Sequence, residues 1–400
     1  MLSWHVKKEV YNCKIMLYNI CSADCGKEVV AGNAAPLFPH GKGINMKKSK
    51  IGAILVIALF ILLTAGCGSR FSSGEESETA EQSAVKEYIV VGFSQLGAES
   101  DWRSANTESM QSTFTEENGF VLLFEDGQQK QANQIMAIRT FIQQEVDYIV
   151  LAPVTETGWD TVLQEAKDAG IPVIIVDRMV DVSDDSLFTC WVGSNFELEA
   201  KKATEWLNQY VTQQEIDPAD IHIVNIQGTI GASAQIGRTR GLENAVRKNG
   251  WDLLAEVTGD FTQAKGKEVM QTLLRQYDNI NVVYCENDNE ALGAIEAIEA
   301  AGKKVGSDIM GGEIMVISFD GVNEQALNYI RQDKITCIAE CNPLHGPRVR
   351  TVIEMLEAGR APDKFSYVEE EIFSANKSIK MLSVDGANYE VTILSQGGNN

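Results

Sequence analysis

Short apolar runs alternate with amphipathic stretches through the middle of the chain, which is the pattern of strands followed by helices. Helices are predicted from Asn106, around residues 135–142, where apolar residues recur at helical spacing, and over "TVLQEAKDAG", which Gly170 ends. The strands predicted around them are "EYIVVGF", "GFVLLFED", "VDYIVLAP" and "IPVIIVD". This first series ends near Asp177–Arg178.

The same alternation restarts near Ile221, with strands "IHIVNIQG", "NVVYCEND" and "EIMVISFDG" and helices through Leu242–Val246 and Leu292–Ile298. Strands that are apolar throughout favour parallel sheets covered on both faces. Strand–helix alternation is typical of βαβ units. The pattern therefore predicts an α/β protein with two doubly wound parallel-sheet lobes.

Polar residues follow the predicted strands directly. They are Ser94-Gln95, Glu125-Asp126, Asp177-Arg178, Gln227-Gly228, Glu286-Asn287-Asp288 and Asp320-Gly321. Because ligands of open α/β sheets bind beyond the carboxyl ends of the strands, two facing lobes would line a cleft with these groups. Planar hydrogen-bonding groups pair well with adjacent sugar hydroxyls, and Trp102 and Phe261 could pack on the apolar face of a sugar.

The segment "NMKKSKIGAILVIALFILLTAGCGSR" resembles a bacterial lipoprotein signal, with basic residues, an apolar run and small residues before Cys67. We expect residues 1–45 to be upstream translation, 46–66 the signal peptide and 67–86 a flexible tether rich in Ser and Glu. A lipid on Cys67 would anchor the protein to the membrane. An uncleaved anchor is the alternative, although the run Ile51–Leu63 is short for a span.

The net charge of −22 argues against a nucleic-acid partner, which would need a basic face. The cysteines after Cys67 are Cys190, Cys285, Cys337 and Cys341, with no CxxC motif and no Cys/His cluster. We therefore expect no metal site and four buried free thiols. A hinge disulfide from Cys190 to Cys337 or Cys341 is the alternative.

Seven motifs in register resemble the periplasmic ribose/galactose-type sugar-binding proteins of ABC transporters, and galactofuranose-binding proteins most closely. The resemblance covers Tyr88 to about Tyr367. The motifs are "VVGFSQLGAESDWR", "DGQQKQANQI", "IPVIIVDR", "IQGTIGASAQIGRTRG", "GDFTQAKGKEVM", "YCENDNEALGAI" and "ISFDG".

The resemblance implies a type I periplasmic binding protein fold, with two lobes joined by a three-strand hinge. We expect an N-terminal lobe of residues 87–192 plus 342–368 and a C-terminal lobe of 193–341 plus 369–396. The crossings between lobes are expected near Gly193, near Asp320–Val322 and near Glu340–Asn342. Hinge closure would then bring both lobes onto the ligand.

The resemblance also implies the ligand-binding residues. Trp102 and Arg103 stand where ribose binders have paired Phe, and Glu340 stands where they have Gln, as in galactofuranose binders, which argues against ribose. The full set is Ser94, Trp102, Arg103, Asp177, Arg178, Arg238, Phe261, Asn287, Asp320, Glu340 and Asn342.

Several of these residues have structural alternatives. Asp177 and Arg178 could form a buried ion pair, Trp102 could be an exposed residue at a helix start, and Phe261 could be core packing. Asn287 and Asp320 could cap the helices that follow them. The Gly-rich "GTIGASAQIG" lacks the residues and spacing of a phosphate-binding loop.

The sequence thus predicts a monomeric binding protein without cofactor. It would capture a galactofuranose-like monosaccharide and deliver it to an ABC permease, working on the outer face of the cell membrane, or in the periplasm of a two-membrane cell. A domain that presents its sugar to a chemoreceptor or histidine kinase is the alternative. A glycosidase using Asp177, Asp320 or Glu340 is disfavoured, because carboxylates paired with Arg and Asn stay ionised. A sugar-responsive repressor is disfavoured because the export signal occupies the place of its DNA-binding helices.

Overall fold

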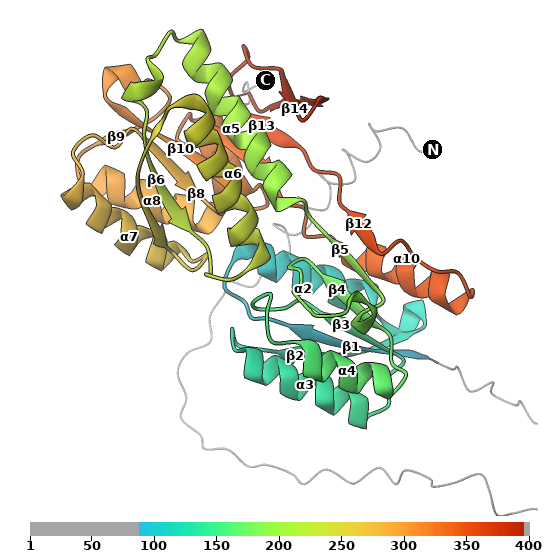
Figure 1. The fold of residues 1–400 in the computed structure, drawn as a ribbon. Coiled ribbons are helices and arrows are strands. Elements are labelled where there is room, and N and C mark those ends of the chain that lie inside the picture. The colour runs from blue at the N-terminus through green and yellow to red at the C-terminus, as the bar shows by residue number, and fades with distance from the viewer. Residues whose placement is uncertain (1–87, 396–400) are drawn as a thin grey trace, which may run out of the picture. The chain divides into compact units, whose positions relative to one another are not determined.

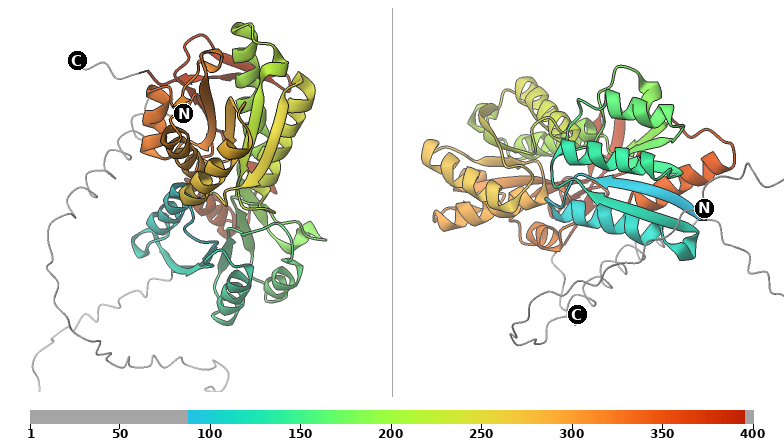
Figure 2. Two further views of the ribbon diagram at one scale, coloured as in Figure 1. Left: turned by 90° about the vertical axis from the view of Figure 1, so that its left-hand side faces the viewer. Right: turned by 90° about the horizontal axis from the view of Figure 1, so that it is seen from below.

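The computed structural model describes residues 88–395, which form two sheets with helices on both faces (Figures 1 and 2). The first sheet has six parallel strands in the order β12-β5-β4-β3-β1-β2. Its strands are β1 (Ile89–Gln95), β2 (Phe120–Asp126), β3 (Tyr148–Leu151), β4 (Val173–Val176), β5 (Cys190–Gly193) and β12 (Phe365–Tyr367).

Alternate residues of these strands pack against opposite helix layers. Ile149 and Ile175 lie in a core cluster with residues of α3 and α4, whereas Val150 and Ile174 pack with residues of α2 and α10. This double burial explains why the strands are apolar throughout. The helices are α2 (Asp101–Thr113), α3 (Gln131–Gln143), α4 (Asp160–Asp168) and α10 (Gly346–Glu357).

The second sheet follows the order β16-β13-β11-β10-β8-β6-β7, with β9 paired to β10 off this path. Its pairs are parallel except β13, which runs antiparallel to β11. Its strands are β6 (His222–Gln227), β7 (Asp252–Thr258), β8 (Val282–Cys285), β9 (Lys304–Val305), β10 (Glu313–Asp320), β11 (Cys337–Glu340), β13 (Ile372–Ser374) and β16 (Thr392–Ile393).

Helices cover both faces of the second sheet as well. The core cluster around Trp206 and Leu242 joins α5 and α6 to one face, and the cluster around Met270 and Leu292 joins α7 and α8 to the other. The helices are α5 (Phe196–Gln213), α6 (Ser233–Asn249), α7 (Gln263–Gln276), α8 (Asp288–Ala300) and α9 (Glu324–Arg331), and β14 (Met381–Val384) and β15 (Ala387–Glu390) form a separate hairpin.

The predicted α/β class with two parallel sheets is confirmed, and each strand predicted from an apolar run is present. The first helix begins at Asp101 rather than Asn106, because the Ser100 side chain caps it by accepting from Arg103 N. Asn287 does cap α8, but Asp320 does not cap α9, whose cap is Asn323.

The chain passes between the two sheets in three places: between β5 and α5 at residues 194–195, between β11 and α10 at 341–345, and between β12 and β13 at 368–371. The crossing expected near Asp320–Val322 is wrong. That segment joins β10 to α9 and β11, and β10 pairs directly with β11 in the second sheet. The lobe ranges 87–192 plus 342–368 and 193–341 plus 369–396 stay predictions.

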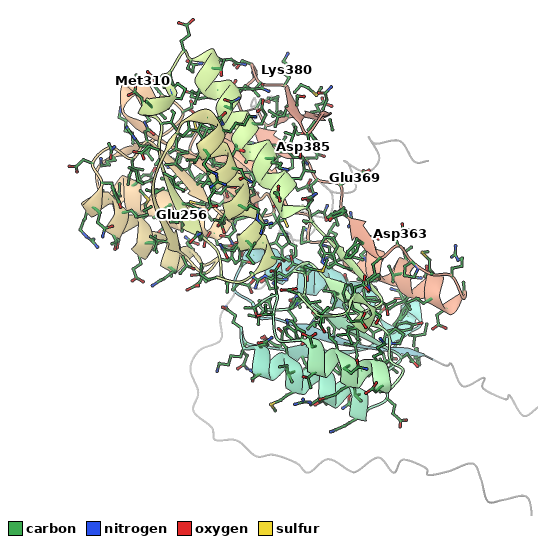
Figure 3. All side chains as sticks on the ribbon, viewed as in Figure 1. Glu256, Met310, Asp363, Glu369, Lys380 and Asp385 are labelled. Carbon is green, nitrogen blue, oxygen red and sulfur yellow. The ribbon has the colours of Figure 1, made fainter. Side chains whose placement is uncertain are left out.

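Acidic side chains such as Glu256, Asp363, Glu369 and Asp385 project from the surface of both sheet regions, in line with the chain's net charge of −22 (Figure 3). The four cysteines of the described part are buried and free, so the predicted free thiols are confirmed and the hinge disulfide is wrong.

The predictions for residues 1–45, 46–66 and 67–86, and for the lipid on Cys67, lie outside the described residues. Within residues 88–395, no helix combines the length and apolar character that crossing a membrane requires.

Candidate functional site

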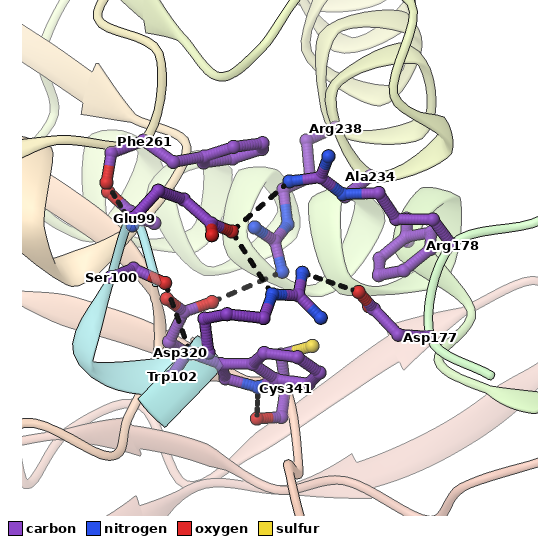
Figure 4. A pocket seen from close by; sticks show the side chains of 13 residues that line it. Glu99, Ser100, Trp102, Asp177, Arg178, Ala234, Arg238, Phe261, Asp320 and Cys341 are labelled. Atoms are coloured by element: carbon purple, nitrogen blue, oxygen red, sulfur yellow. Dashed lines mark hydrogen bonds and ion pairs between the residues drawn. The ribbon is translucent and has the colours of Figure 1, made fainter. Parts of the chain in front are cut away.

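A small, nearly filled cavity with about 20 Å³ of free space lies between the carboxyl ends of the strands of the two sheets (Figure 4). Its walls come from both lobes and from one crossing between them. The lining residues are Glu99, Ser100, Trp102, Arg103, Asp177, Arg178, Phe196, Ala234, Arg238, Phe261, Asn287, Asp320 and Cys341.

The wall of the first lobe is a chain of alternating charges. Arg103 Nη2 donates to Asp177 Oδ2 at 2.6 Å, and Arg103 Nε donates to Glu99 Oε1 at 3.1 Å. Arg178 Nη2 donates to the same Glu99 oxygen at 3.4 Å. All four side chains are at most 5% exposed, so these contacts are formed out of water.

One acceptor on this wall is left over. Glu99 Oε2 is buried, lines the cavity with the rest of its side chain, and has no hydrogen-bond partner among residues 88–395. An unpaired carboxylate oxygen is costly to bury, and a ligand hydroxyl that donates to it would remove that cost.

Asp177 and Arg178 keep their charges at neutral pH. Burial alone would raise the pKa of Asp177, but Arg103 and Arg178 outweigh burial and hold it below its usual value. Burial and the neighbouring Arg103 lower the pKa of Arg178 to about 10, which still leaves it charged. Asp177 therefore forms its ion pair with Arg103 and not with Arg178, the partner named as the structural alternative.

The wall of the second lobe is organised by Arg238. Its Nε donates to Glu199 Oε2 at 2.9 Å, its Nη1 to the backbone oxygen of Glu286 at 2.5 Å and its Nη2 to Asp320 Oδ1 at 3.4 Å. Burial raises the pKa of Asp320 well above its usual value, and Arg238 offsets this only in part. These three hydrogen bonds fix the Arg238 guanidinium in position before any ligand binds.

Aromatic rings close the cavity from both sides. The Arg178 guanidinium lies 5.3 Å from the Phe261 ring centroid, across the lobes. Trp102 Nε1 donates to the backbone oxygen of Cys341 at 2.6 Å, which leaves the indole face beside Arg103. Phe261 fits only because Gly228 has no side chain: a Cβ there would lie 1.9 Å from the ring.

Backbone conformation also marks this site. Asp177, Phe261 and Asp320 have φ values of 61°, 60° and 95°, which non-glycine residues rarely adopt. Such conformations persist only where the surroundings hold them, and all three residues line the cavity.

The cavity brings together most of the residues predicted from the sequence. Trp102, Arg103, Asp177, Arg178, Arg238, Phe261, Asn287 and Asp320 all line it. Asn287 caps α8, and its Nδ2 donates to the Phe261 backbone oxygen at 3.0 Å, while its contact with the ligand stays a prediction.

Ser94, Glu340 and Asn342 do not line the cavity. Ser94 lies inside β1, which extends to Gln95, and its hydroxyl is near Gln134. Glu340 accepts from Glu371 N at 2.7 Å, and Asn342 Oδ1 accepts from Leu344 N at 3.0 Å, so both brace the crossings.

The sequence interpretation missed Glu99, Ser100, Phe196, Ala234 and Cys341. Glu99 and Ser100 stand inside the motif "VVGFSQLGAESDWR", so their signal was present next to Trp102. Phe196 begins α5, and Cys341 is a lone cysteine, so neither carried a local signal.

His345, which lies behind Trp102 at a ring separation of 5.7 Å, gives a test of this packing. Burial lowers its pKa from 6.5 to about 4, although Asp177 opposes the shift. In this window the unfolded chain binds a proton that the native protein does not, so acidification to pH 4.5 should cost about 2 kcal/mol at this residue.

We therefore expect His345→Phe, which keeps an aromatic ring, to lose less stability than the parent between pH 7 and 4.5. Urea denaturation at both pH values measures the difference. An identical loss in the two proteins would contradict a buried neutral His345.

The arrangement offers fixed guanidinium donors, carboxylate acceptors and aromatic faces within a small, buried space. Neutral molecules with several hydroxyls match such a set, because each hydroxyl both donates and accepts. Two parallel-sheet lobes, three crossings and a cavity between strand ends define a two-lobed binding protein. A family model for the periplasmic binding protein domain matches residues 91–345, and the chain belongs to this family, whose members bind their ligands and are not enzymes.

Among its relatives, the galactofuranose-binding protein YtfQ of Escherichia coli is 39% identical over 71% of this chain and 87% of its own length. A structure from Mycobacterium smegmatis in complex with β-D-fucofuranose is 41% identical, with a TM-score of 0.67 over 72% of this chain and 91% of the other. The binding protein of the arabinose ABC transporter from Shewanella, bound to L-arabinofuranose, is 38% identical, with a TM-score of 0.65 over 71% and 91%.

Proposed function

We propose that this protein is the sugar-binding component of an ABC importer and that it captures a monosaccharide in its furanose form, galactofuranose or a close relative. The similar chains are described as binding galactofuranose, fucofuranose or arabinofuranose, and one belongs to an arabinose ABC transporter. This favours transport over the sensor alternative.

The observation that carries the proposal is the charged wall of Glu99, Arg103, Asp177 and Arg178 facing Arg238 and Phe261 across one cavity. Two adjacent sugar hydroxyls can donate to a carboxylate and accept from a guanidinium at the same time. The sugar's apolar face can lie against an aromatic ring. Because the wall groups already hold each other, the ligand does not have to order them.

Capture is proposed to occur by hinge closure, because backbone and side-chain groups also meet across the lobes. Met179 N donates to Ser233 Oγ at 2.9 Å, and Glu156 N donates to the Gly231 oxygen at 3.0 Å. A ligand that touches both lobes stabilises the closed arrangement. The permease would then recognise the closed protein.

We further propose that a lipid on Cys67 and the tether of residues 67–86 hold the protein at the outer face of the membrane. The sequence pattern before Cys67 supports this. Metabolic labelling with a fatty acid should mark the parent protein and not a Cys67→Ala variant.

The sugar assignment is tested by thermal denaturation with galactofuranosides, L-arabinose, D-fucose, D-galactose, D-ribose and myo-inositol. A sugar at about 100 times its dissociation constant should stabilise the protein by about 2.7 kcal/mol. We expect Asp177→Asn to weaken binding by about 10- to 100-fold, since a hydrogen bond to a charged group contributes about 1.5–3 kcal/mol.

Asp160→Asn is the matched control, because that exposed carboxylate accepts from Ser183 in the same lobe and lies outside the cavity. Equal sugar affinity in Asp177→Asn and the parent would rule out the assigned cavity. Stabilisation by a pyranose or by inositol alone would rule out the furanose assignment.

A further inference from the structure

A cluster of carboxylates and one thiol lies where the chain passes between the lobes. One carboxylate oxygen of Glu199, one of Glu370 and the Cys341 sulfur lie within 4.8 Å of one another. Glu199 stands in the first turn of α5, just after the first crossing, Cys341 begins the second crossing, and Glu370 lies in the third. The cluster therefore draws one group from the second crossing, one from the third and one from the helix that follows the first crossing.

A fourth polar atom borders this cluster. The Ser194 hydroxyl donates to Glu370 Oε1 at 2.5 Å and lies 3.3 Å from Cys341 Sγ. Asn342 N donates to the same Glu370 oxygen at 2.9 Å. Two carboxylates, a thiol and a hydroxyl thus share one small space.

One of these carboxylates is incompletely satisfied. Glu199 is 1% exposed, and Arg238 binds its Oε2 at 2.9 Å. Its Oε1 has no hydrogen-bond partner within residues 88–395. A buried carboxylate oxygen without a partner is unfavourable, so this atom calls for a ligand of its own.

We propose that Glu199, Cys341 and Glu370 bind a divalent cation of the zinc class at the hinge. A sulfur ligand with carboxylate oxygens suits Zn²⁺, whereas Mg²⁺ and Ca²⁺ select oxygen ligands alone. Bond lengths of about 2.0–2.3 Å place the ligand atoms of a tetrahedral site about 3.5 Å apart, so the cluster needs to contract by about 1 Å.

The charges of the site balance when the cation is bound. Binding releases the Cys341 thiol proton to solvent, and the resulting thiolate joins two carboxylates to give three negative charges. The cation supplies two positive charges, and Arg238 beside Glu199 supplies a third, which it shares with Asp320. Glu370 is partly exposed, which gives the cation a route into the site.

This site goes beyond sugar capture and does not depend on which sugar is bound. Because two of its ligands lie in separate crossings and the third in the helix that follows the remaining crossing, the cation would brace the hinge. Only Cys341 also lines the sugar cavity.

Titration of the purified reduced full-length protein with Co²⁺ tests the proposal, because thiolate coordination produces a charge-transfer band in the near ultraviolet. We expect a band component that saturates at one equivalent and disappears in Cys341→Ser. Glu370→Gln should weaken Co²⁺ affinity by at least about tenfold, since removing a metal ligand costs more affinity than removing a residue that hydrogen-bonds to a ligand. Zn²⁺ should displace the Co²⁺.

Two variants are matched controls. Cys190→Ser removes another buried thiol, and Glu371→Gln changes the neighbouring carboxylate, whose Oε2 accepts from Thr392 instead. Both should keep the band. Glu370→Gln retains an oxygen acceptor for Ser194 and Asn342, so it can fold even if Cys341→Ser does not. A spectrum unchanged in Cys341→Ser or in Glu370→Gln, or the absence of any thiolate band in the parent, would overturn the proposal whatever the sugar experiments show.

Discussion

Replacing Arg238 with alanine is expected to lower the free energy of unfolding by about 3–5 kcal/mol, the usual cost of removing one partner from a buried ion pair. The substitution leaves Glu199 and Asp320 buried without their cation, at 1% and 4% exposure. It also frees the Glu286 backbone oxygen, which accepts from the same guanidinium. Urea denaturation at pH 7.5 measures the loss, and the sugar-induced stabilisation should disappear as well.

Arg247→Ala is the control on the same helix, α6. Arg247 is 64% exposed and pairs with Glu243 at 3.7 Å, so its removal should change stability by less than about 1 kcal/mol. Similar losses in the two variants would mean that the pairs of Arg238 contribute no more than a surface contact. Arg238→Lys should recover part of the stability but little of the sugar affinity, because an ammonium cannot form the same planar set of bonds.

The second large effect is expected from Gly228→Ala. A Cβ at this position would lie 1.9–2.4 Å from three atoms of the Phe261 ring, so the ring has to move. Overpacking of this kind costs about 1–3 kcal/mol, and here the displaced ring forms part of the cavity wall. We expect sugar affinity, measured by calorimetric titration, to fall by at least about 30-fold.

Gly293→Ala separates cavity shape from overpacking. Its Cβ would lie 2.1 Å from the Gln263 backbone oxygen, between α7 and α8 and outside the cavity lining. Backbone atoms cannot rotate away, so the overpacking cost should exceed the gain of up to about 1 kcal/mol in helix propensity. Stability should fall while sugar affinity stays at the parent value. Parent-like affinity in Gly228→Ala would show that Phe261 is not part of the binding surface.

Much of the fold could be predicted from the sequence because its strands are buried on both faces. Runs such as "IPVIIV" are apolar without interruption, and the polar Asp177 directly after this run marks the carboxyl end of its strand. Asp177, Asn287 and Asp320 were predicted on this basis, and each lines the cavity. Arg238 lies on a helix, and only the family resemblance pointed to it. Phe261 lies on a loop and was named before the resemblance only as an aromatic ring that could pack on a sugar.

The rest depended on features that a local pattern does not carry. Ser94 was placed one residue after its strand, but hydrogen bonding extends β1 to Gln95 and keeps Ser94 within the sheet. Glu340, which the resemblance implied, ends β11, but its carboxylate accepts a hydrogen bond from Glu371 N in a neighbouring crossing. The third crossing was placed after β10 because nothing local shows that β11 pairs beside β10.

The contacts at the rim of the cavity limit how well the closed conformation distinguishes sugar-bound protein from sugar-free protein. Asp101 N donates to Asn289 Oδ1 at 3.1 Å, and Met179 N meets Ser233, yet none of these residues touches the space where the sugar is proposed to bind. Such contacts favour closure equally in loaded and unloaded molecules, at about tenfold in population for each 1.4 kcal/mol. Stronger hydrogen bonds at the rim would raise the sugar affinity. They would also raise, by the same factor, the ratio of closed to open molecules in the sugar-free protein, which the transporter would meet in the same conformation as the sugar-bound protein. High sugar affinity and clear discrimination between sugar-bound and sugar-free protein therefore place opposite requirements on these rim residues.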